Sequence, residues 1–238
     1  MTLSKSSAVI LGTLICLGLV LLGLTLGRGA LAYKNLERTV TVKGLSVHEY
    51  PADTVIWPIT YSVQKNTLEG LYENIDQNNK MIMNFLLKNG ISEDEISRSS
   101  PRVRDKLSQH YNDRPFQGIR FQASQTLTVH SKNIETVKAL MARLSELGKR
   151  GVIITGENYD VRTEYIFSAL NEIKPKMIEE ATQNARLVAE KFSEDSQSQL
   201  GKIKTARQGQ FSITARDQNN PDIKKIRVVS TITYYLSD

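Results

Sequence analysis

The sequence predicts an α+β protein: two β-α-β-β-like units form mostly antiparallel sheet with helices packed on it, preceded by one N-terminal transmembrane helix. Three observations predict this class. An apolar run lies near the N-terminus, three later stretches space apolar residues as helices do, and strand-like alternation flanks those stretches. We divide the chain into a short tail (residues 1–7), a transmembrane or signal-anchor helix (8–26), a linker (27–37) and a folded domain (38–238).

The composition is that of a globular protein. Of 238 residues, 40% are hydrophobic and 24% are charged, and the formal net charge is +6. The only cysteine, Cys16, lies in the apolar run, so the folded domain can form neither a disulfide nor a cysteine-ligated metal site. These values exclude a largely disordered chain, and the positive charge mildly favours anionic partners.

The first element is the apolar run from Ala8 to Leu26. Its nineteen uncharged residues make a helix of about 28 Å, close to the roughly 30 Å of the bilayer hydrocarbon core. Ala30 and Ala32 form an A-x-A cleavage pattern, but the run exceeds a typical signal core and Arg28 precedes the pattern. We expect a retained, single-pass anchor in the cytoplasmic (inner) membrane with the domain in the periplasm. Cleavage after Ala32, which would give a soluble periplasmic oligomer, is the alternative.

The folded domain opens with two strands and a helix. Alternation predicts strands over residues 38–44 and 53–64. Proline cannot donate to a ladder, so Pro58 predicts that the second strand lies at an edge or has a bulge. Helical spacing of apolar residues from Leu68 predicts a helix that ends at Asn89-Gly90.

Four more strands and a second helix follow. Strands are predicted over 95–104 and 119–131, and the alternation of the latter predicts one buried and one solvated face. A helix from Ile134 that ends before Gly148 is followed by a short strand over residues 151–155 and a longer one over 158–167.

The third helical pattern is the strongest. It starts at Leu170 and assigns Val188 and Phe192 to a buried stripe that also contains several alanines. Pro175 fits the first turn of a helix, so we expect the regular helix to begin near Lys174. The alanines predict close packing of this helix on the sheet of its own chain.

Strands over residues 202–214 and 224–236 close the chain. The order strand, long helix, strand, strand therefore occurs at 53–131 and again at 158–236. We interpret the domain as two units of the same pattern.

Two segments resemble the SIMPL domain family, bacterial exported proteins of unknown function. Residues 38–61, RTVTVKGLSVHEYPADTVIWPITY, resemble its opening strand, glycine and PAD segment. Residues 170–213 resemble its closing helix, in which alanines recur before a Leu-Gly and a strand. The resemblance implies an α+β fold exported to the periplasm, large homo-oligomers in some members, and loose links to oxidative and envelope stress. It supplies no catalytic residue.

Sequence patterns for catalysis are absent. G-x-S-x-G, a Walker loop, G-x-G-x-x-G and H-E-x-x-H do not occur, and His48, His110 and His130 stand in no metal-ligand spacing. The acidic run at residues 93–95 is explained better by a solvated turn than by acid–base chemistry. We therefore predict no catalytic, cofactor-binding or metal site, and keep an unrecognised envelope hydrolase as the alternative.

The most unusual polar stretch is residues 97–121, where basic side chains are interleaved with Tyr111 and Phe116. A solvated hairpin between two strands explains it first, and a surface for anionic lipid or a partner protein second. Export would exclude nucleic acid as a natural partner, whereas a cytoplasmic domain would allow it. The candidate anionic-partner surface comprises Arg98, Arg102, Arg104, Lys106, Arg114 and Arg120.

These observations predict a membrane-anchored, extracytoplasmic protein that acts without catalysis as a binding or assembly module of the cell envelope. Its expected partners are the membrane, an envelope protein or anionic lipid, and copies of itself. No cofactor and no nucleic acid are expected.

Overall fold

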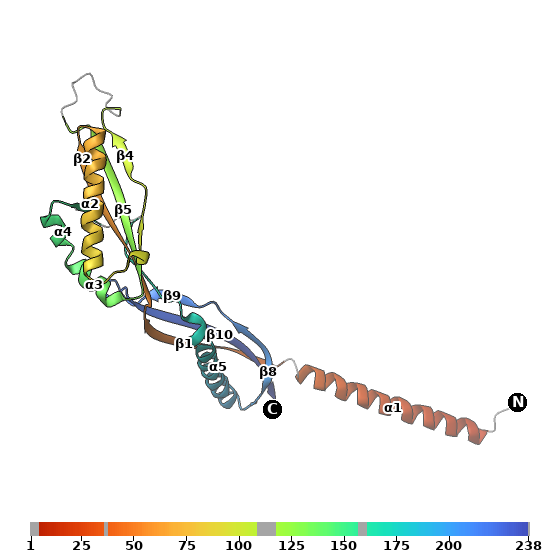
Figure 1. Cartoon of the computed structure of the whole chain (residues 1–238). Coiled ribbons are helices and arrows are strands. Elements are labelled where there is room, and N and C mark those ends of the chain that lie inside the picture. Colours follow the sequence, from red (N-terminus) through yellow and green to blue (C-terminus); the bar gives the residue numbers. More distant parts are fainter. Residues whose placement is uncertain (1–4, 36–37, 109–117, 157–160, 238) are drawn as a thin grey trace. The chain divides into compact units, whose positions relative to one another are not determined.

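The computed structural model describes residues 5–35, 38–108, 118–156 and 161–237. It confirms the α+β class, with mostly antiparallel sheets that carry helices and an apolar helix before them (Figure 1). The chain divides into two compact units. Unit 1 contains residues 1–48, 173–212 and 226–238, and unit 2 contains residues 49–172 and 213–225.

The first helix is α1 (Lys5–Asn35). Its segment Leu11–Gly29 is long and apolar enough to cross a membrane, a property that membrane anchors and signal sequences share. The helical backbone continues through residues 30–32, which carry the A-x-A pattern, and through most of the segment expected to be a linker.

The sheet of unit 2 is built on one long antiparallel pair. Strand β2 (Thr54–Lys65) pairs with β5 (Phe121–Ser131) from Val55 opposite Ser131 to Lys65 opposite Phe121. The short strands β3 (Ile96–Arg98) and β4 (Arg102–Asp105) pair with the far side of β5, in place of the single strand expected over 95–104. Strands β6 (Ile153–Thr155) and β7 (Glu164–Ile166) pair with the far side of β2.

The prediction drawn from Pro58 was wrong. Strand β2 is internal, and its register with β5 has no shift at Pro58. On the other side of β2, β7 pairs with residues 54–56 and β6 with residues 60–62, so the gap between them falls at Pro58. On that side, β2 has a local edge at Pro58 where no described strand requires an N–H, and a proline is tolerated at such an edge.

Helices cover one face of this sheet. Helix α2 (Leu68–Lys88) begins where the Thr67 side chain accepts a hydrogen bond from the Gly70 amide, and it runs along β2 and β5 (Figure 1). Helices α3 (Ile134–Ala142) and α4 (Ser145–Lys149) pack on the same core. Gly148 lies inside α4, and the turn after it uses Gly151 with φ +92°.

Unit 1 is formed mainly by three long elements from the two ends of the folded domain. Strand β1 (Thr39–Pro51), helix α5 (Leu170–Asp195) and strand β10 (Ile223–Ser237) pack around a small core. The sheet order is β1-β10-β8, where β8 is Gln199–Gln208, and β9 (Ser212–Ala215) also pairs with β10. The alanines of α5 are buried within this one chain, as expected.

The two units repeat one pattern, but with a different opening strand from the one predicted. In unit 2 the order is β2, α2, β3 and β4, then β5, and β5 lies between β2 and the β3–β4 side. In the other sheet the order along the chain is β1, α5, β8 and β9, then β10, with β10 in the corresponding central place; most of β9 belongs to unit 2. The segment 158–167 therefore does not open the second unit, because its strand β7 pairs with β2.

Helix α5 also differs from its prediction. It begins at Leu170, and Pro175 lies inside it, not in its first turn. Near the other end of the helix, Val188 and Phe192 are exposed, although their spacing had placed them in the buried stripe.

Candidate functional site

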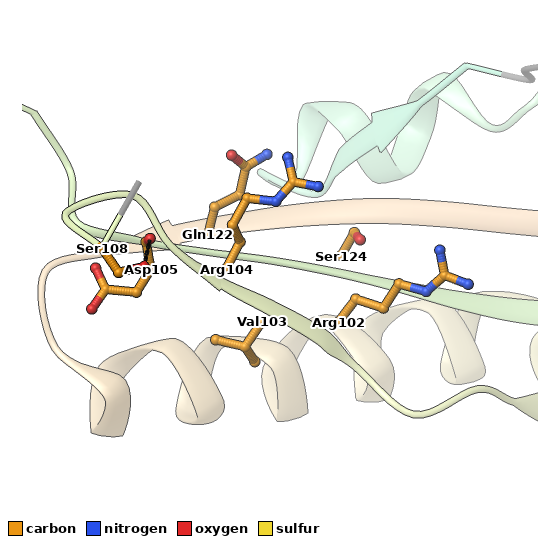
Figure 2. Close-up of a pocket in the computed structure, with 7 residues that line it drawn as sticks. All are labelled: Arg102, Val103, Arg104, Asp105, Ser108, Gln122 and Ser124. Carbon is orange, nitrogen blue, oxygen red and sulfur yellow. Dashed lines mark hydrogen bonds between the residues drawn. The ribbon is translucent and has the colours of Figure 1, made fainter. Parts of the chain in front are cut away.

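Two arginines of the candidate surface lie side by side on β4. Arg102 is paired with Ser124 of β5 and Arg104 with Gln122, so these four side chains share the sheet face opposite Val103 and the buried Ala123. Figure 2 shows the arginines on the side of Gln122 and Ser124, while Val103 points the other way. They line an open cleft of about 500 Å³ whose end is formed by Asp105 and Ser108.

Two other members of the predicted surface are already engaged. The Arg120 Nη2 donates to the Asp105 Oδ2 at 2.9 Å, and its Nε donates to both carboxylate oxygens at 3.2 Å. Hydrogen bonding from Arg120 lowers the pKa of Asp105, and the pKa of Arg120 is raised in turn. The Lys106 Nζ donates to the Gln64 side chain at 3.3 Å. These two cations are therefore less available to a partner.

Arg98 lies on the other face of the sheet. It is paired with Leu127, whose side chain is buried under the helices. Leu127 lies three positions along β5 from Ser124, the partner of Arg102, and this odd number of positions puts Arg98 on the opposite face. Arg114 lies outside the described residues. The structure thus brings Arg102 and Arg104 together and separates them from Arg98, which spacing in the sequence did not indicate.

A band of hydroxyl side chains continues the arginine face across the sheet. Thr60 and Thr126 are directly opposite and their Oγ1 atoms are hydrogen-bonded at 2.8 Å, and Ser62 is opposite Ser124. On the next strand, the Thr155 hydroxyl donates to the Thr60 carbonyl at 3.1 Å. This face is polar and hydrogen-bonding, whereas the helix-covered face is apolar.

A buried polar network on the helix-covered face contacts the segment that joins β3 to β4. The Tyr61 hydroxyl lies 2.8 Å from the Gln125 Oε1, which also accepts from the Asn79 Nδ2 at 3.0 Å. The Gln125 Nε2 donates to the Ser99 carbonyl at 2.6 Å, in the segment that joins β3 to β4. The network therefore fixes the point at which the chain changes from the Arg98 face to the Arg102 face.

This network changes the ionisation of Tyr61. Burial, with a smaller contribution from Asp76, raises the pKa of the phenol to about 12. Neither Gln125 nor Asn79 is among the site residues predicted from the sequence. The available signal was Gln125 itself, because the alternation along 119–131 places this polar residue on the apolar face.

The histidines form no common site among the described residues. His48 contacts the Glu180 Oε2, and the Ser46 hydroxyl donates to the same oxygen at 2.8 Å. The serine thus bonds the carboxylate and not the imidazole, unlike a nucleophile paired with its base. His130 lies on β5, and His110 is outside the described residues. In the described ranges, no group of three or more His, Cys, Asp or Glu side chains could hold a metal ion.

Two polar segments noted in the sequence have structural roles. Residues Glu93–Glu95 form a short 3-10 helix in which the Glu95 carboxylate accepts from the Ser92 amide, in agreement with a solvated turn. In the PAD segment, the Asp53 Oδ2 accepts from the amides of Ser168 and Ala169 at 2.5 and 3.3 Å, just before α5 begins. The Ala52 amide donates to the Asp222 carbonyl at 2.7 Å. PAD is therefore a junction of three chain segments.

These features define a class of α+β protein in which helices cover one face of an antiparallel sheet and the other face, in unit 2, is polar with an arginine pair at its edge. The particular family is SIMPL, described as a protein of unknown function (DUF541): its profile matches residues 40–233, and the chain belongs to it. A search of curated proteins found no match to the chain.

Proposed function

We propose that this SIMPL protein is a membrane-anchored, non-catalytic binding module whose unit 2 holds an acidic polypeptide segment along β4. The observation that carries the proposal is the pair Arg102 and Arg104. Both guanidinium groups line the same cleft, and neither has a charged partner among the described residues. Guanidinium groups that have no charged partner can bind carboxylates through two parallel hydrogen bonds.

The spacing of the pair favours an extended peptide. Alternate residues of a strand repeat at about 6.6–6.8 Å, so Arg102 and Arg104 match carboxylates on every second residue of a neighbouring strand. Side chains directly opposite in such a pair approach to about 4.5–5.5 Å. Within the described residues only β5 pairs with β4, so the other edge of β4 offers its backbone groups to an added strand.

The charge count favours a protein segment over a lipid surface. Binding to anionic membranes typically uses clusters of about four to eight basic residues, each contributing about 1 kcal/mol. Here Arg120 is neutralised by Asp105 and Arg98 lies on the other face. Of the candidate surface, the described cations that remain are three, below that range: Arg102 and Arg104 in fixed register, and Lys106, which is hydrogen-bonded to Gln64. Two cations in fixed register suit a spaced pair of carboxylates better than a diffuse sheet of phosphates.

Helix α1 supports the anchoring part of the proposal. Its apolar length equals a membrane span, and a retained anchor with an exported domain would tether the protein to the periplasmic side of the inner membrane. A C-terminal alkaline phosphatase fusion should be active if the domain is exported. Intact mass of the protein recovered from membranes should show the full chain, and loss of the first 32 residues would contradict anchoring.

Binding can be tested with the full chain in nanodiscs and a fluorescent peptide of alternating Glu and Thr. We expect the double variant R102Q/R104Q to lose roughly tenfold in affinity, the range for losing two solvent-accessible ion pairs. The control is Arg98→Gln, which removes one positive charge from the other face and should leave the affinity within about twofold.

A peptide of the same composition with its Glu residues grouped together distinguishes an effect of carboxylate spacing from an effect of total charge. It should bind several-fold more weakly. Equal binding of the two peptides, or equal losses in R98Q and in the double variant, would contradict the proposed site. Competition by phosphatidylglycerol vesicles as strong as that by the alternating peptide would favour lipid and also contradict it.

A further inference from the structure

Unit 1 has an exposed apolar patch on α5. Leu187, Val188 and Phe192 are 63%, 41% and 55% exposed, and with Lys191 and Asp195 they line an open cleft of about 460 Å³. Contiguous apolar surface of this kind on a folded domain commonly marks a contact site. The sequence pattern had assigned Val188 and Phe192 to the core, so these residues are apolar at positions that the fold leaves uncovered.

The patch lies on the helix that packs against the edge strand of the unit 1 sheet. Helix α5 packs on β1, which is the outermost strand in the order β1-β10-β8. The Asn184 side chain donates to the Leu45 carbonyl of β1 at 2.8 Å, and Val188 and Phe192 follow Asn184 at four-residue steps on the same flank. Because Val188 and Phe192 are exposed, no described strand covers this flank of the helix.

The patch also lies at the end of unit 1 where the chain arrives from α1. Val40 and Val42, near the start of β1, belong to the same core cluster as Ala189 of α5. The Leu236 amide donates to the Arg38 carbonyl at 2.9 Å, which places the end of strand β10 here as well. Three residues separate Asn35, the end of α1, from Thr39, the start of β1, and such a connection spans at most about 15 Å.

We infer that Leu187, Val188 and Phe192 contact the lipid interface of the membrane in which α1 is anchored. The inference rests on the anchoring part of the proposed function and extends it to a second, peripheral membrane contact. Apolar side chains on the exposed flank of a helix bind bilayers by entering the boundary between headgroups and acyl chains.

The size of the patch favours the membrane over a second copy of the chain. Three side chains of about 150–200 Å² each, exposed by about half, offer on the order of 300 Å². A stable protein interface needs about 800 Å² on each partner. A contact joined to its target by a short connection needs less, because tethering raises the effective concentration to about the millimolar range.

The charges beside the patch indicate that apolar contact carries this interaction. The Lys191 Nζ lies 3.2 Å from the Glu194 carboxylate, and the Arg186 Nε lies 2.9 Å from the Glu190 carboxylate, so each cation is paired along the helix. Contact should therefore occur on zwitterionic phosphatidylcholine and change little with salt.

Spin labels on the full chain, reconstituted in phosphatidylcholine vesicles, test the inference. Cys16 is the only native cysteine, so its label reports whether α1 is inserted. In a Cys16→Ser background, labels at Leu187→Cys and Phe192→Cys report the patch. The matched control is Ile153→Cys on β6 of unit 2, a similarly exposed apolar position. Each label is tested for relaxation by oxygen, which partitions into lipid, and by a water-soluble nickel chelate.

We expect the ratio of oxygen to nickel accessibility at residues 187 and 192 to exceed that at residue 153 several-fold. Ratios equal to the control, with Cys16 in lipid, would overturn the patch contact while leaving the anchor intact. A water-exposed Cys16 would contradict the anchor and with it this inference. Spin–spin broadening at residue 192 that persists on dilution with lipid would show a second copy on the patch and overturn the inference.

Discussion

Gly44 of β1 lies directly against Ala181 of α5. A Cβ atom at residue 44 would overlap the Ala181 carbonyl oxygen and the Ala185 amide nitrogen, both of which belong to the helix backbone. The alanines of α5 and this glycine together allow the strand and the helix to touch along their backbones. The close approach also positions the flank that carries the exposed apolar patch.

Gly44→Ala should destabilise unit 1 by about 1–3 kcal/mol or more, because a backbone contact cannot move aside as a side chain does. Thermal unfolding of the full chain in detergent, followed by circular dichroism, measures the effect. Gly148→Ala in α4 is the matched control: nothing lies within 4 Å of its added Cβ, so its stability should stay the same or rise. Equal melting curves for the two variants would contradict the backbone contact.

Asp53→Ala should cost about 1 kcal/mol, the usual loss when a carboxylate that accepts helix-start amides is removed. Burial alone would raise the pKa of Asp53, but hydrogen bonds from Ser168, Thr54 and Ala169 outweigh it, and the pKa is lowered. The carboxylate therefore stabilises the fold above its ordinary value near 3.8, and this contribution is lost as the pH falls through the lowered pKa.

Urea unfolding of the full chain between pH 3 and pH 7 measures this contribution. Asp53→Asn should show a smaller loss of stability on acidification than the wild type. Asp94→Ala, an exposed carboxylate in the 3-10 helix, is the control and should match the wild type. An unchanged acid dependence in D53N would mean that Asp53 does not act as a charged acceptor.

Tyr61→Phe should remove part of the alkaline dependence of stability. The folded pKa of Tyr61 is raised from 10.0 to about 12, so its stabilising contribution is present below pH 10 and is lost as the pH rises through 12. The difference corresponds to about 2–3 kcal/mol between the two protonation states. Unfolding at pH 8 and pH 11.5 should show a smaller fall for Y61F than for the wild type. Tyr72→Phe on the exposed side of α2 is the control and should fall as the wild type does.

Asp105→Asn should tighten the binding of the alternating Glu–Thr peptide several-fold. The substitution removes a negative charge from the end of the cleft and frees Arg120, which Asp105 now holds by two oxygens. Fluorescence anisotropy at low and high salt measures the change, and the gain should shrink at high salt. Glu135→Gln, an exposed carboxylate on α3, is the charge control. Equal gains in both variants would indicate a general charge effect.

The long elements could be predicted because each has a strong local period. The alternation of β2 and β5 and the helical stripe of α2 place their apolar residues correctly, and Asn89-Gly90 marks the end of that helix. Predictions that depended on strand neighbours were wrong. Pro58 is tolerated because β6 and β7 leave a gap beside it, and 158–167 was given the place of β1, which lies more than a hundred residues earlier.

The candidate site was likewise predicted in its residue types and not in its arrangement. Residue types identified a basic stretch, but a stretch of sequence does not state which sheet face each side chain occupies. The break between β3 and β4 puts Arg98 on one face and Arg102 with Arg104 on the other, and Asp105 takes Arg120 out of the set. The apolar patch could not be predicted because Phe192 fits a buried stripe by spacing, whereas the fold leaves its side chain exposed.

By itself the sequence determined the α+β class, the apolar helix near the N-terminus, the family resemblance and the long elements. Each of these depends on local periodicity or on a motif formed by residues close together in the chain. The tertiary structure alone decided which strand opens unit 1, which arginines share a cleft, and which apolar residues remain exposed. These depend on strand register and on contacts such as Gly44 with Ala181, between residues far apart in the chain.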